Sequence, residues 1–350
     1  MTTGEGATSV KAATDASEAI QVRNTGFDPL GPVVCSKVVG SGRTVNYIDD
    51  GGAGAVPLLF LGGAGTTVRA FRLLEFARSF RHELGIRVVS VERNGLGQSV
   101  FDPAVGLDEY AADVWSLLDA LGIGQISVLA ISGGGPYAAA IIAARPVQVR
   151  SLHLACAFAE RPERADALME ADAVAADPVA WWRFPADSSI HSIPGFVDSV
   201  IEEATRGLFA KGRDVPPDGL RQAFGLYASE PLRDLSSVQA PAFLYWGSED
   251  ELVPPEQMGR WTAALAGSAM VERVYLGEGH DVQYRHWDQI LADVKFLGGR
   301  IVASRGGRTQ LIVPEEEAEF LAAGGILGIA AWQRPTDAPP EPFPGPTLQR

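Results

Sequence analysis

Six short, continuous apolar runs are the feature that most restricts what this chain can fold into. A strand buried on one face alternates apolar and polar residues, whereas a strand buried on both faces is apolar throughout. The runs therefore predict strands of a parallel sheet that is covered on both sides. They lie at Pro57–Leu61, Ile86–Val91, Gln125–Ile131, Val149–Cys156, Ala242–Trp246 and Met270–Leu276.

Helical patterns separate most of these runs. Apolar residues recur at three- and four-residue steps from Leu107 to Leu121, and Gly122 follows as a stop signal. The apolar stretch 137–144 ends before Pro146, as a helix packed against a sheet would. Strands that alternate with helices require right-handed crossovers, which predicts an α/β fold with a doubly wound, mostly parallel sheet.

The remaining patterns divide the chain into parts. Residues 1–32 have no apolar run and are expected to form a flexible tail. Residues 33–156 and 241–298 hold the sheet, which begins with an antiparallel hairpin. Residues 157–240 carry helical patterns but no strand pattern, which indicates a helical lid insertion. Residues 299–350 are expected to form an extension with a strand pair, a helix and a proline-rich tail.

Aromatic residues are unusually frequent in the predicted lid. An insertion at the carboxyl edge of a parallel sheet covers the place where open α/β folds bind ligands. The alternative is a set of ordinary surface helices, but the aromatics outnumber what a thin helical layer could bury. We therefore expect a pocket for an apolar small molecule, lined by Trp181, Trp182, Phe184 and Trp246.

The segment around Ser132 combines a strand, a tight turn and a helix. The apolar positions 128–131 lead directly into Ser132-Gly133-Gly134-Gly135, and an alanine-rich stretch follows. Small residues on both sides, Ala130 and Gly134, allow the two backbones to approach while the serine hydroxyl stays free to attack an electrophile. A plain glycine-rich turn between strand and helix is the alternative.

A serine hydroxyl needs a general base to become nucleophilic at neutral pH. Of the five histidines, only His280 follows a predicted strand end in a glycine-rich turn. His82 lies on a charged helix end, His153 in a buried strand and His191 in the insertion, which favours structural roles for these three. His286 is expected on a helix face and ranks second to His280.

The base in turn needs an orienting carboxylate. Asp250 follows the predicted strand Ala242–Trp246 by a short loop, so it would lie at the same sheet edge as the serine. Its neighbours Glu249 and Glu251 compete for the role, and Glu160, just beyond the preceding strand, is the alternative acid.

An oxyanion that forms during acyl transfer needs two backbone N–H donors. Gly133, directly after the serine, is one expected donor, and Gly63 in the loop Leu61–Gly65 is the other. That loop does not match a nucleotide-binding fingerprint, because it lacks the third glycine and any Lys-Ser/Thr pair.

Charge and cysteine content narrow the partners further. The net charge of −14 disfavours nucleic acids and anionic membranes, because both repel an acidic protein. Cys35 and Cys156 are isolated, which predicts free thiols in a reducing cytoplasm and no metal site. No window of 18 uninterrupted apolar residues exists, so no membrane span is expected. The chain carries no signal for a cofactor.

Taken together, the motifs resemble the α/β-hydrolase superfamily over roughly Val33 to Gly298, in its serine-nucleophile esterase and lactonase-like branch. The resemblance rests on the loops already described and on the turn Arg93–Ser99. It implies that Ser132 is the nucleophile, His280 the base and Asp250 the orienting acid.

Three positions depart from the family pattern. Leu61 stands where many relatives have histidine, and Asn94 stands where proline is usual. The segment beyond Gly299 has no counterpart in the family. Covering the sheet edge, forming a homodimer contact and contributing to the pocket are its three open roles.

Three functions fit this resemblance. The leading hypothesis is hydrolysis of a carboxylic ester or lactone of an apolar, ring-containing molecule through an acyl-Ser132 intermediate. The alternatives are carbon–carbon bond hydrolysis or cofactor-free oxygenation on the same fold, and a receptor-like protein with little turnover. Membership of a superfamily does not choose among them.

Overall fold

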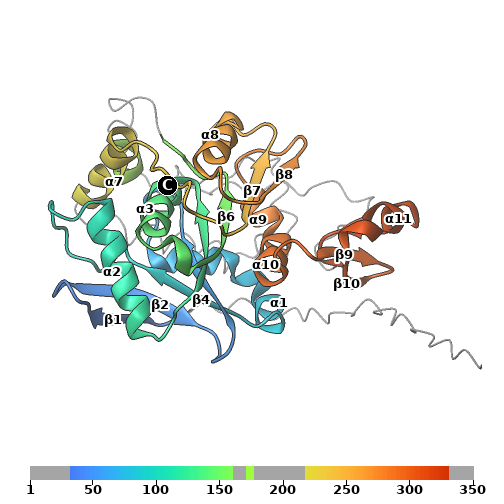
Figure 1. The fold of residues 1–350 in the computed structure, drawn as a ribbon, viewed down its shortest axis with the longest axis horizontal. Helices are drawn as coiled ribbons and strands as arrows, with labels where there is room; N and C mark the ends of the chain where they lie inside the picture. The colour runs from blue at the N-terminus through green and yellow to red at the C-terminus, as the bar shows by residue number, and fades with distance from the viewer. Residues whose placement is uncertain (1–31, 161–170, 177–216, 331–350) are drawn as a thin grey trace, which may run out of the picture.

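An eight-stranded sheet forms the centre of the molecule (Figure 1). The structure, a computed structural model, describes residues 32–160, 171–176 and 217–330. The strand order is β1-β2-β4-β3-β5-β6-β7-β8. The strands are β1 (Val34–Val38), β2 (Thr44–Asp50), β3 (Val56–Leu61), β4 (Ile86–Val91), β5 (Ile126–Ile131), β6 (Val149–Ala155), β7 (Ala242–Gly247) and β8 (Met270–Tyr275).

The direction of the strands follows the sequence prediction. β1 pairs antiparallel with β2, and β2 pairs antiparallel with β4. All other neighbours in the sheet, from β4 to β8, are parallel. The predicted mostly parallel sheet with an N-terminal antiparallel hairpin is therefore confirmed. The parallel strands end at one edge, and the loops after β3, β4, β5, β6, β7 and β8 meet there.

Both faces of the sheet are covered, which explains the continuous apolar runs. Alternate residues of one strand belong to different hydrophobic clusters: Leu59 to one and Leu58 to the other, and likewise Val128 and Leu129. Residues of α2 (Leu107–Ala120), α3 (Gly135–Ala144), α7 (Asp218–Ser229) and α8 (Glu256–Ala264) complete the first cluster. Residues of the 3-10 helix η1 (Val68–Ala77), of α1 (Arg78–Glu83) and of α10 (Trp287–Phe296) complete the second.

The last strand departs from the prediction of burial on both faces. β8 lies at the edge of the sheet, and its residues alternate between half-buried and exposed. Val274 is 42% exposed and Leu276, just past the strand, is 87% exposed. A strand at the edge has a neighbour on one side only, so its side chains are covered less completely.

A small second sheet follows α10 and lies at the red end of the chain in Figure 1. It consists of β9 (Ile301–Arg305), β10 (Arg308–Ile312) and β11 (Ile326–Leu327), with α11 (Glu317–Ala322) between the last two. Two side chains of α10 bind it: Gln289 Oε1 accepts the N–H of Val302, and Asp288 Oδ2 accepts the N–H of Ile329, both at 2.9 Å. The extension is thus anchored to the helix that precedes it.

Parts of three predicted segments lie outside the described residues. They are most of the N-terminal tail 1–32, most of the lid 157–240, of which α7 is described as a helix, and the proline-rich end of 299–350. Within the described ranges, no helix combines the length and the apolar character that crossing a bilayer requires.

Candidate functional site

Ser132 lies at a sharp turn between β5 and α3, where the 3-10 helix η2 (Ser132–Gly134) connects the two. Its φ of +49° is in the left-handed region, which a residue with a Cβ rarely adopts. The turn passes very close to its neighbours. A Cβ on Gly134 would lie 2.5 Å from the carbonyl oxygen of Leu61, and one on Gly135 would collide with that of Phe158. The strained turn is therefore maintained by packing that only glycine permits.

His280 and Asp250 form a hydrogen-bonded pair at the same edge. His280 follows β8 and Asp250 follows β7, and His280 Nδ1 lies 2.9 Å from Asp250 Oδ2. The other carboxylate oxygen, Oδ1, accepts the N–H groups of Leu252 at 3.0 Å and Val253 at 2.8 Å. Both oxygens of Asp250 are thus fixed, and the imidazole has its Nε2 on the far side of the ring from the acid.

The loop that carries His280 packs against the end of β7. A Cβ on Gly247, at the end of β7, would collide with the carbonyl oxygens of Glu278 and Gly279. The loop therefore lies directly over the end of β7, and only glycine allows that approach. A ring nitrogen of His280 lies within 4.8 Å of Cys156 Sγ, which follows the next strand inward, β6.

Four neighbouring strands end in four side chains at the same edge of the sheet: Ser132 after β5, Cys156 after β6, Asp250 after β7 and His280 after β8. The backbone N–H of Phe158 donates to the carbonyl oxygen of Ser132 at 2.9 Å, which joins the loop after β6 to the turn after β5. The topology therefore explains why residues up to 148 positions apart in sequence lie at one edge of the sheet.

Asp250 is ionised although its side chain is fully buried. Burial alone would raise its pKa. The hydrogen bond and charge of His280, the N–H of Val253 and the Cys156 thiol together offset burial and hold the pKa of Asp250 below its ordinary value. An ionised carboxylate at this position stabilises an imidazolium, which is what the partner of a general base must do.

Cys156 was predicted only as a buried free thiol, and its contact with the acid is new. It is fully buried and has a φ of +45°. Burial raises the pKa of this thiol well above its ordinary value, and the neighbouring Asp250 raises it further. The neutral thiol lies 3.7 Å from the carbonyl oxygen of Tyr245, to which it donates, and it also contacts the Asp250 carboxylate, so it is a donor rather than a nucleophile. No sequence signal identifies this contact, because it depends on the left-handed turn at Cys156.

The competing acids and bases have other partners. Glu160, the alternative acid, forms an ion pair with Arg260 of α8. His286 lies 2.8 Å from Glu278 and stacks on Tyr275.

His153 is buried in β6, beside Ser151 and the hydroxyl of Tyr245. Burial, with the charges of Arg150 and Arg273, lowers its pKa to about 3, so it stays neutral. His191 lies outside the described residues.

The loop after β3, which carries the predicted donor Gly63, also places the backbone nitrogen of Ala64 beside Gly133. A Cβ on Gly133 would lie 2.8 Å from the backbone nitrogen of Ala64. The carbonyl of Gly63 is bound on its other side, by Thr66 Oγ1 at 2.7 Å and Arg93 Nη2 at 2.6 Å. In a trans peptide the N–H points opposite to the preceding carbonyl. The N–H of Ala64 therefore points away from Thr66 and Arg93, and it is a second candidate donor beside the predicted Gly63.

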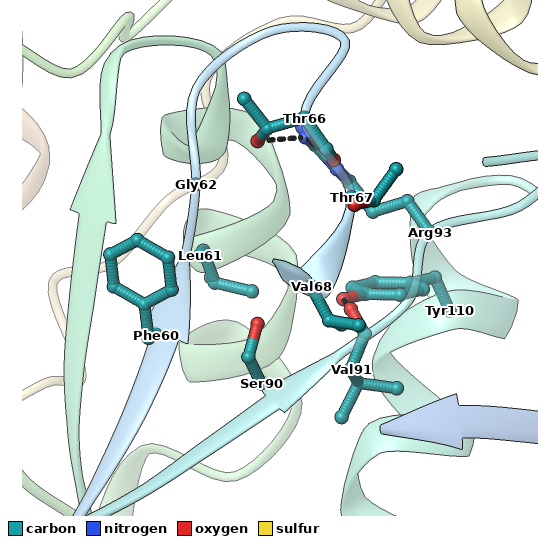
Figure 2. A pocket seen from close by; sticks show the side chains of 10 residues that line it. All are labelled: Phe60, Leu61, Gly62, Thr66, Thr67, Val68, Ser90, Val91, Arg93 and Tyr110. Atoms are coloured by element: carbon teal, nitrogen blue, oxygen red, sulfur yellow. Dashed lines mark hydrogen bonds between the residues drawn. The ribbon is translucent and has the colours of Figure 1, made fainter. Parts of the chain in front are cut away.

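A small cavity of about 10 Å³ lies beneath this loop, and Figure 2 shows the side chains of Thr66, Arg93 and Tyr110 at its edge. A space of this size holds about one water molecule, so it is too small for a substrate. It separates the loop from the end of β4 at Ser90 and Val91.

The predicted pocket residues are placed only in part. Trp181, Trp182 and Phe184 lie outside the described residues. Trp246 is fully buried in the hydrophobic core, and its Nε1 donates to the carbonyl oxygen of Val253 at 2.8 Å. The expectation that Trp246 lines a substrate pocket is corrected accordingly: this indole supports the loop that carries Asp250.

In the described part of the chain, the side chains grouped closely enough to hold a metal ion are those of Cys156, Asp250 and His280. One ligand atom each from Cys156, Asp250 and His280 lie within 4.8 Å of one another. Two ligand atoms on a tetrahedral zinc are separated by about 3.3 Å. His280 Nδ1 and Asp250 Oδ2 are closer, at 2.9 Å, which is an ordinary hydrogen-bond distance. The arrangement is therefore complete as an acid–base pair.

Comparison with known proteins points to one family. Residues 56–286 match the family model of the alpha/beta hydrolase fold, which spans the parallel sheet from β3 to β8 and every site residue discussed above. None of the curated proteins compared with the chain matches it.

Several solved structures share the fold. The enol-lactonase from Burkholderia xenovorans LB400 is 21% identical, with a TM-score of 0.57 over 74% of this chain and 98% of that one. An esterase from Exiguobacterium antarcticum is 21% identical, with a TM-score of 0.54 over 74% and 97%. A thermophilic esterase from Thermogutta terrifontis is 18% identical, with a TM-score of 0.53 over 75% and 97%. At these identities the likeness concerns the fold.

Proposed function

Because the chain belongs to the alpha/beta hydrolase fold family, we propose that it is a serine hydrolase that cleaves a carboxylic ester or lactone through an acyl-Ser132 intermediate. The observation that carries this proposal is the bond between His280 Nδ1 and Asp250 Oδ2, at the edge where Ser132 emerges. Esterases and an enol-lactonase among the structural neighbours support the choice of reaction class.

The first half-reaction forms the acyl-enzyme. His280 Nε2 takes the proton of the Ser132 hydroxyl while Oγ attacks the carbonyl carbon of the substrate. The carbonyl oxygen becomes an oxyanion and accepts the N–H groups of Gly133 and Ala64. Collapse of this intermediate breaks the bond to the leaving oxygen, which receives the proton from His280. In a lactone the leaving alcohol stays attached to the acyl group.

The second half-reaction returns the enzyme to its starting state. His280 removes a proton from water, the resulting hydroxide attacks the acyl carbon, and Ser132 leaves with the proton from His280. Asp250 holds the imidazole in the tautomer with its proton on Nδ1 throughout, because its own oxygens are fixed by the N–H groups of Leu252 and Val253.

The proposed substrate class rests on the aromatic residues of the predicted lid. Phe158 and Tyr227 pack on the turn from the core side, since a Cβ on Gly133 would lie 2.9 Å from the Tyr227 hydroxyl and Gly135 packs on Phe158. The predicted lid adds Trp181, Trp182 and Phe184. Aromatic side chains of this kind suit an apolar, ring-containing acyl or alcohol group.

A fluorophosphonate probe followed by a substrate panel tests the proposal. The wild-type protein is expected to take up one probe per chain, on Ser132, and to hydrolyse aryl esters or aromatic lactones. Ser132→Ala is expected to lose both properties. Unchanged labelling of Ser132→Ala would refute the proposal. Oxygen consumption during turnover would indicate an oxygenase, and tight ligand binding without product would indicate a receptor.

A further inference from the structure

Arg93 is a buried cation with an unusual set of partners. It follows β4 and is only 5% exposed. Its Nη2 donates to the carbonyl oxygens of Gly63 at 2.6 Å and Thr66 at 2.7 Å, and to Thr66 Oγ1 at 3.0 Å. Its Nη1 donates to the hydroxyl of Tyr227 at 3.3 Å. All of the acceptors on Nη2 belong to the loop after β3, as Figure 2 shows for Thr66.

Within the described part of the chain, no carboxylate forms a salt bridge with Arg93. The nearest one in sequence, Glu92, accepts the N–H of Val68 instead, at 3.1 Å. The guanidinium packs over the ring of Tyr137, with 5.3 Å from Cζ to the ring centroid. A buried charge without a carboxylate partner costs several kcal/mol, so its retention calls for a reason other than stability.

The position of the charge supplies that reason. The guanidinium binds the carbonyl oxygen of the peptide that joins Gly63 to Ala64, and the nitrogen of the same peptide lies 2.8 Å from where a Cβ on Gly133 would be. A cation that binds the carbonyl fixes the plane of this peptide. It also polarises the peptide, which strengthens the N–H as a donor on the opposite side. Both effects are greatest where a negative charge develops next to that N–H.

Building on the proposed function, we propose that Arg93 is a positioning residue of the oxyanion hole: its guanidinium holds the Gly63 carbonyl so that the N–H of Ala64 faces the oxyanion beside Gly133. Arg93 acts through the backbone and does not touch the substrate. Its contribution is made in the transition state, when the oxyanion forms, and not in the binding of the substrate before reaction.

Arg93→Met is the direct test, since methionine keeps apolar volume and removes every donor. We expect the rate constant of fluorophosphonate labelling at Ser132, and kcat for an aryl ester, to fall about 10²–10³-fold, as for the loss of one oxyanion-hole donor. KM is expected to stay within about threefold of wild type. The affinity for a trifluoromethyl ketone, which forms a tetrahedral oxyanion on the serine, is expected to fall in parallel with kcat. The affinity for the corresponding amide, which stays planar, is expected to stay unchanged.

Arg145→Met is the matched control. Arg145 packs over the ring of Trp115 at 5.1 Å, much as Arg93 packs over Tyr137, but its guanidinium binds the exposed Asp119. This variant is expected to label at the wild-type rate. Arg93→Lys restores a charge and one or two donors, so it is expected to recover most of the lost rate. If a thermal scan shows that Arg93→Met does not fold, Arg93→Gln is compared with Arg93→Lys. Both side chains keep N–H donors but only lysine keeps the positive charge, so the lysine variant is expected to be faster.

Each outcome separates the two proposals. A wild-type protein that is not labelled at Ser132 contradicts the proposed function. Labelled wild type with folded Arg93→Met of undiminished rate leaves the function standing and overturns the role of Arg93. Equal losses of affinity for the ketone and the amide would also overturn it, because they would show a general disturbance of the site.

Discussion

Replacing Asp250 with asparagine is expected to remove nearly all activity, and the structure specifies the reason. Oδ1 of Asp250 accepts two backbone N–H groups, from Leu252 and Val253. In the variant only the amide oxygen can occupy this position, because an NH₂ group would face two donors. The NH₂ group must therefore take the place of Oδ2, which lies 2.9 Å from His280 Nδ1.

This orientation reverses the tautomer of His280. The amide donates to Nδ1, so the imidazole proton moves to Nε2, and a protonated Nε2 cannot accept the proton of Ser132. The loss expected for a base in the wrong tautomer is about 10⁴-fold in kcat, or roughly 5.4 kcal/mol at 1.36 kcal/mol for each factor of ten. The side chain is isosteric and both N–H bonds are kept, so stability is expected to change little by comparison.

Hydrolysis of an aryl ester between pH 6 and 10, with a thermal scan to verify folding, measures this effect. Glu249→Gln is the control, because Glu249 is an exposed carboxylate on the same loop, and we expect its kcat to stay within about twofold of wild type. A folded Asp250→Asn protein whose kcat falls less than about tenfold would show that Asp250 does not set the tautomer of His280. Glu160 would then be the next acid to test.

Three further predictions concern the same edge of the sheet. Burial raises the pKa of Glu92 from 4.5 to about 7. Its ionisation therefore destabilises the fold above pH 7, and this penalty is relieved as the pH falls toward 4.5. Glu92→Gln should raise the free energy of unfolding in urea by about 3 kcal/mol at pH 8 and by only about 1 kcal/mol at pH 5, and a gain that grows toward acid pH would contradict this. Cys156→Ala removes the thiol that helps to hold the pKa of Asp250 low, and this removal makes the carboxylate a stronger partner for protonated His280. The acid limb of the pH–rate profile should therefore move to higher pH, with a loss of less than about tenfold in kcat, and a superimposable profile would exclude the contact. Because Ser132 has a left-handed φ, Ser132→Gly should be more stable than Ser132→Ala by about 1 kcal/mol, and the reverse order in thermal unfolding would argue against strain at the turn.

The sheet could be predicted from the sequence because burial on two faces leaves a direct mark. β5 and β7 are buried along their whole length and hold a single polar residue between them besides Tyr245, namely Ser127. Five of the six predicted runs coincide with strands whose residues are all or mostly buried. The exception, β8, is an edge strand, and its run contains Glu272 and Arg273, so the apolar pattern is interrupted in the one strand that is least buried.

The site was predictable to the level of loops but not of individual contacts. The glycine-rich turns place Ser132, Asp250 and His280 at one edge, since the ends of parallel strands meet there. The side chain of Arg93 binds the carbonyl oxygen of Gly63 from a different loop of the chain. No local pattern contains that information.

The burial of Trp246 has a similar explanation. Side chains of a strand alternate between two faces, and an apolar run does not show which face turns toward a ligand. Trp246 belongs to the cluster formed with α3 and α8 and is bound by the loop at Val253. The sequence therefore predicted Trp246 in the pocket, whereas its side chain supports the loop that carries Asp250.

Trapping the acyl-enzyme shows directly whether Ser132 is acylated during turnover. The protein is mixed with a p-nitrophenyl ester of an aromatic acid, quenched with acid within milliseconds and measured by intact and peptide mass spectrometry. We expect a burst of one p-nitrophenolate per chain and an acyl group on the peptide that contains Ser132, both absent in Ser132→Ala. Steady hydrolysis with the acyl group on another residue, or with no covalent intermediate in either protein, would contradict this expectation.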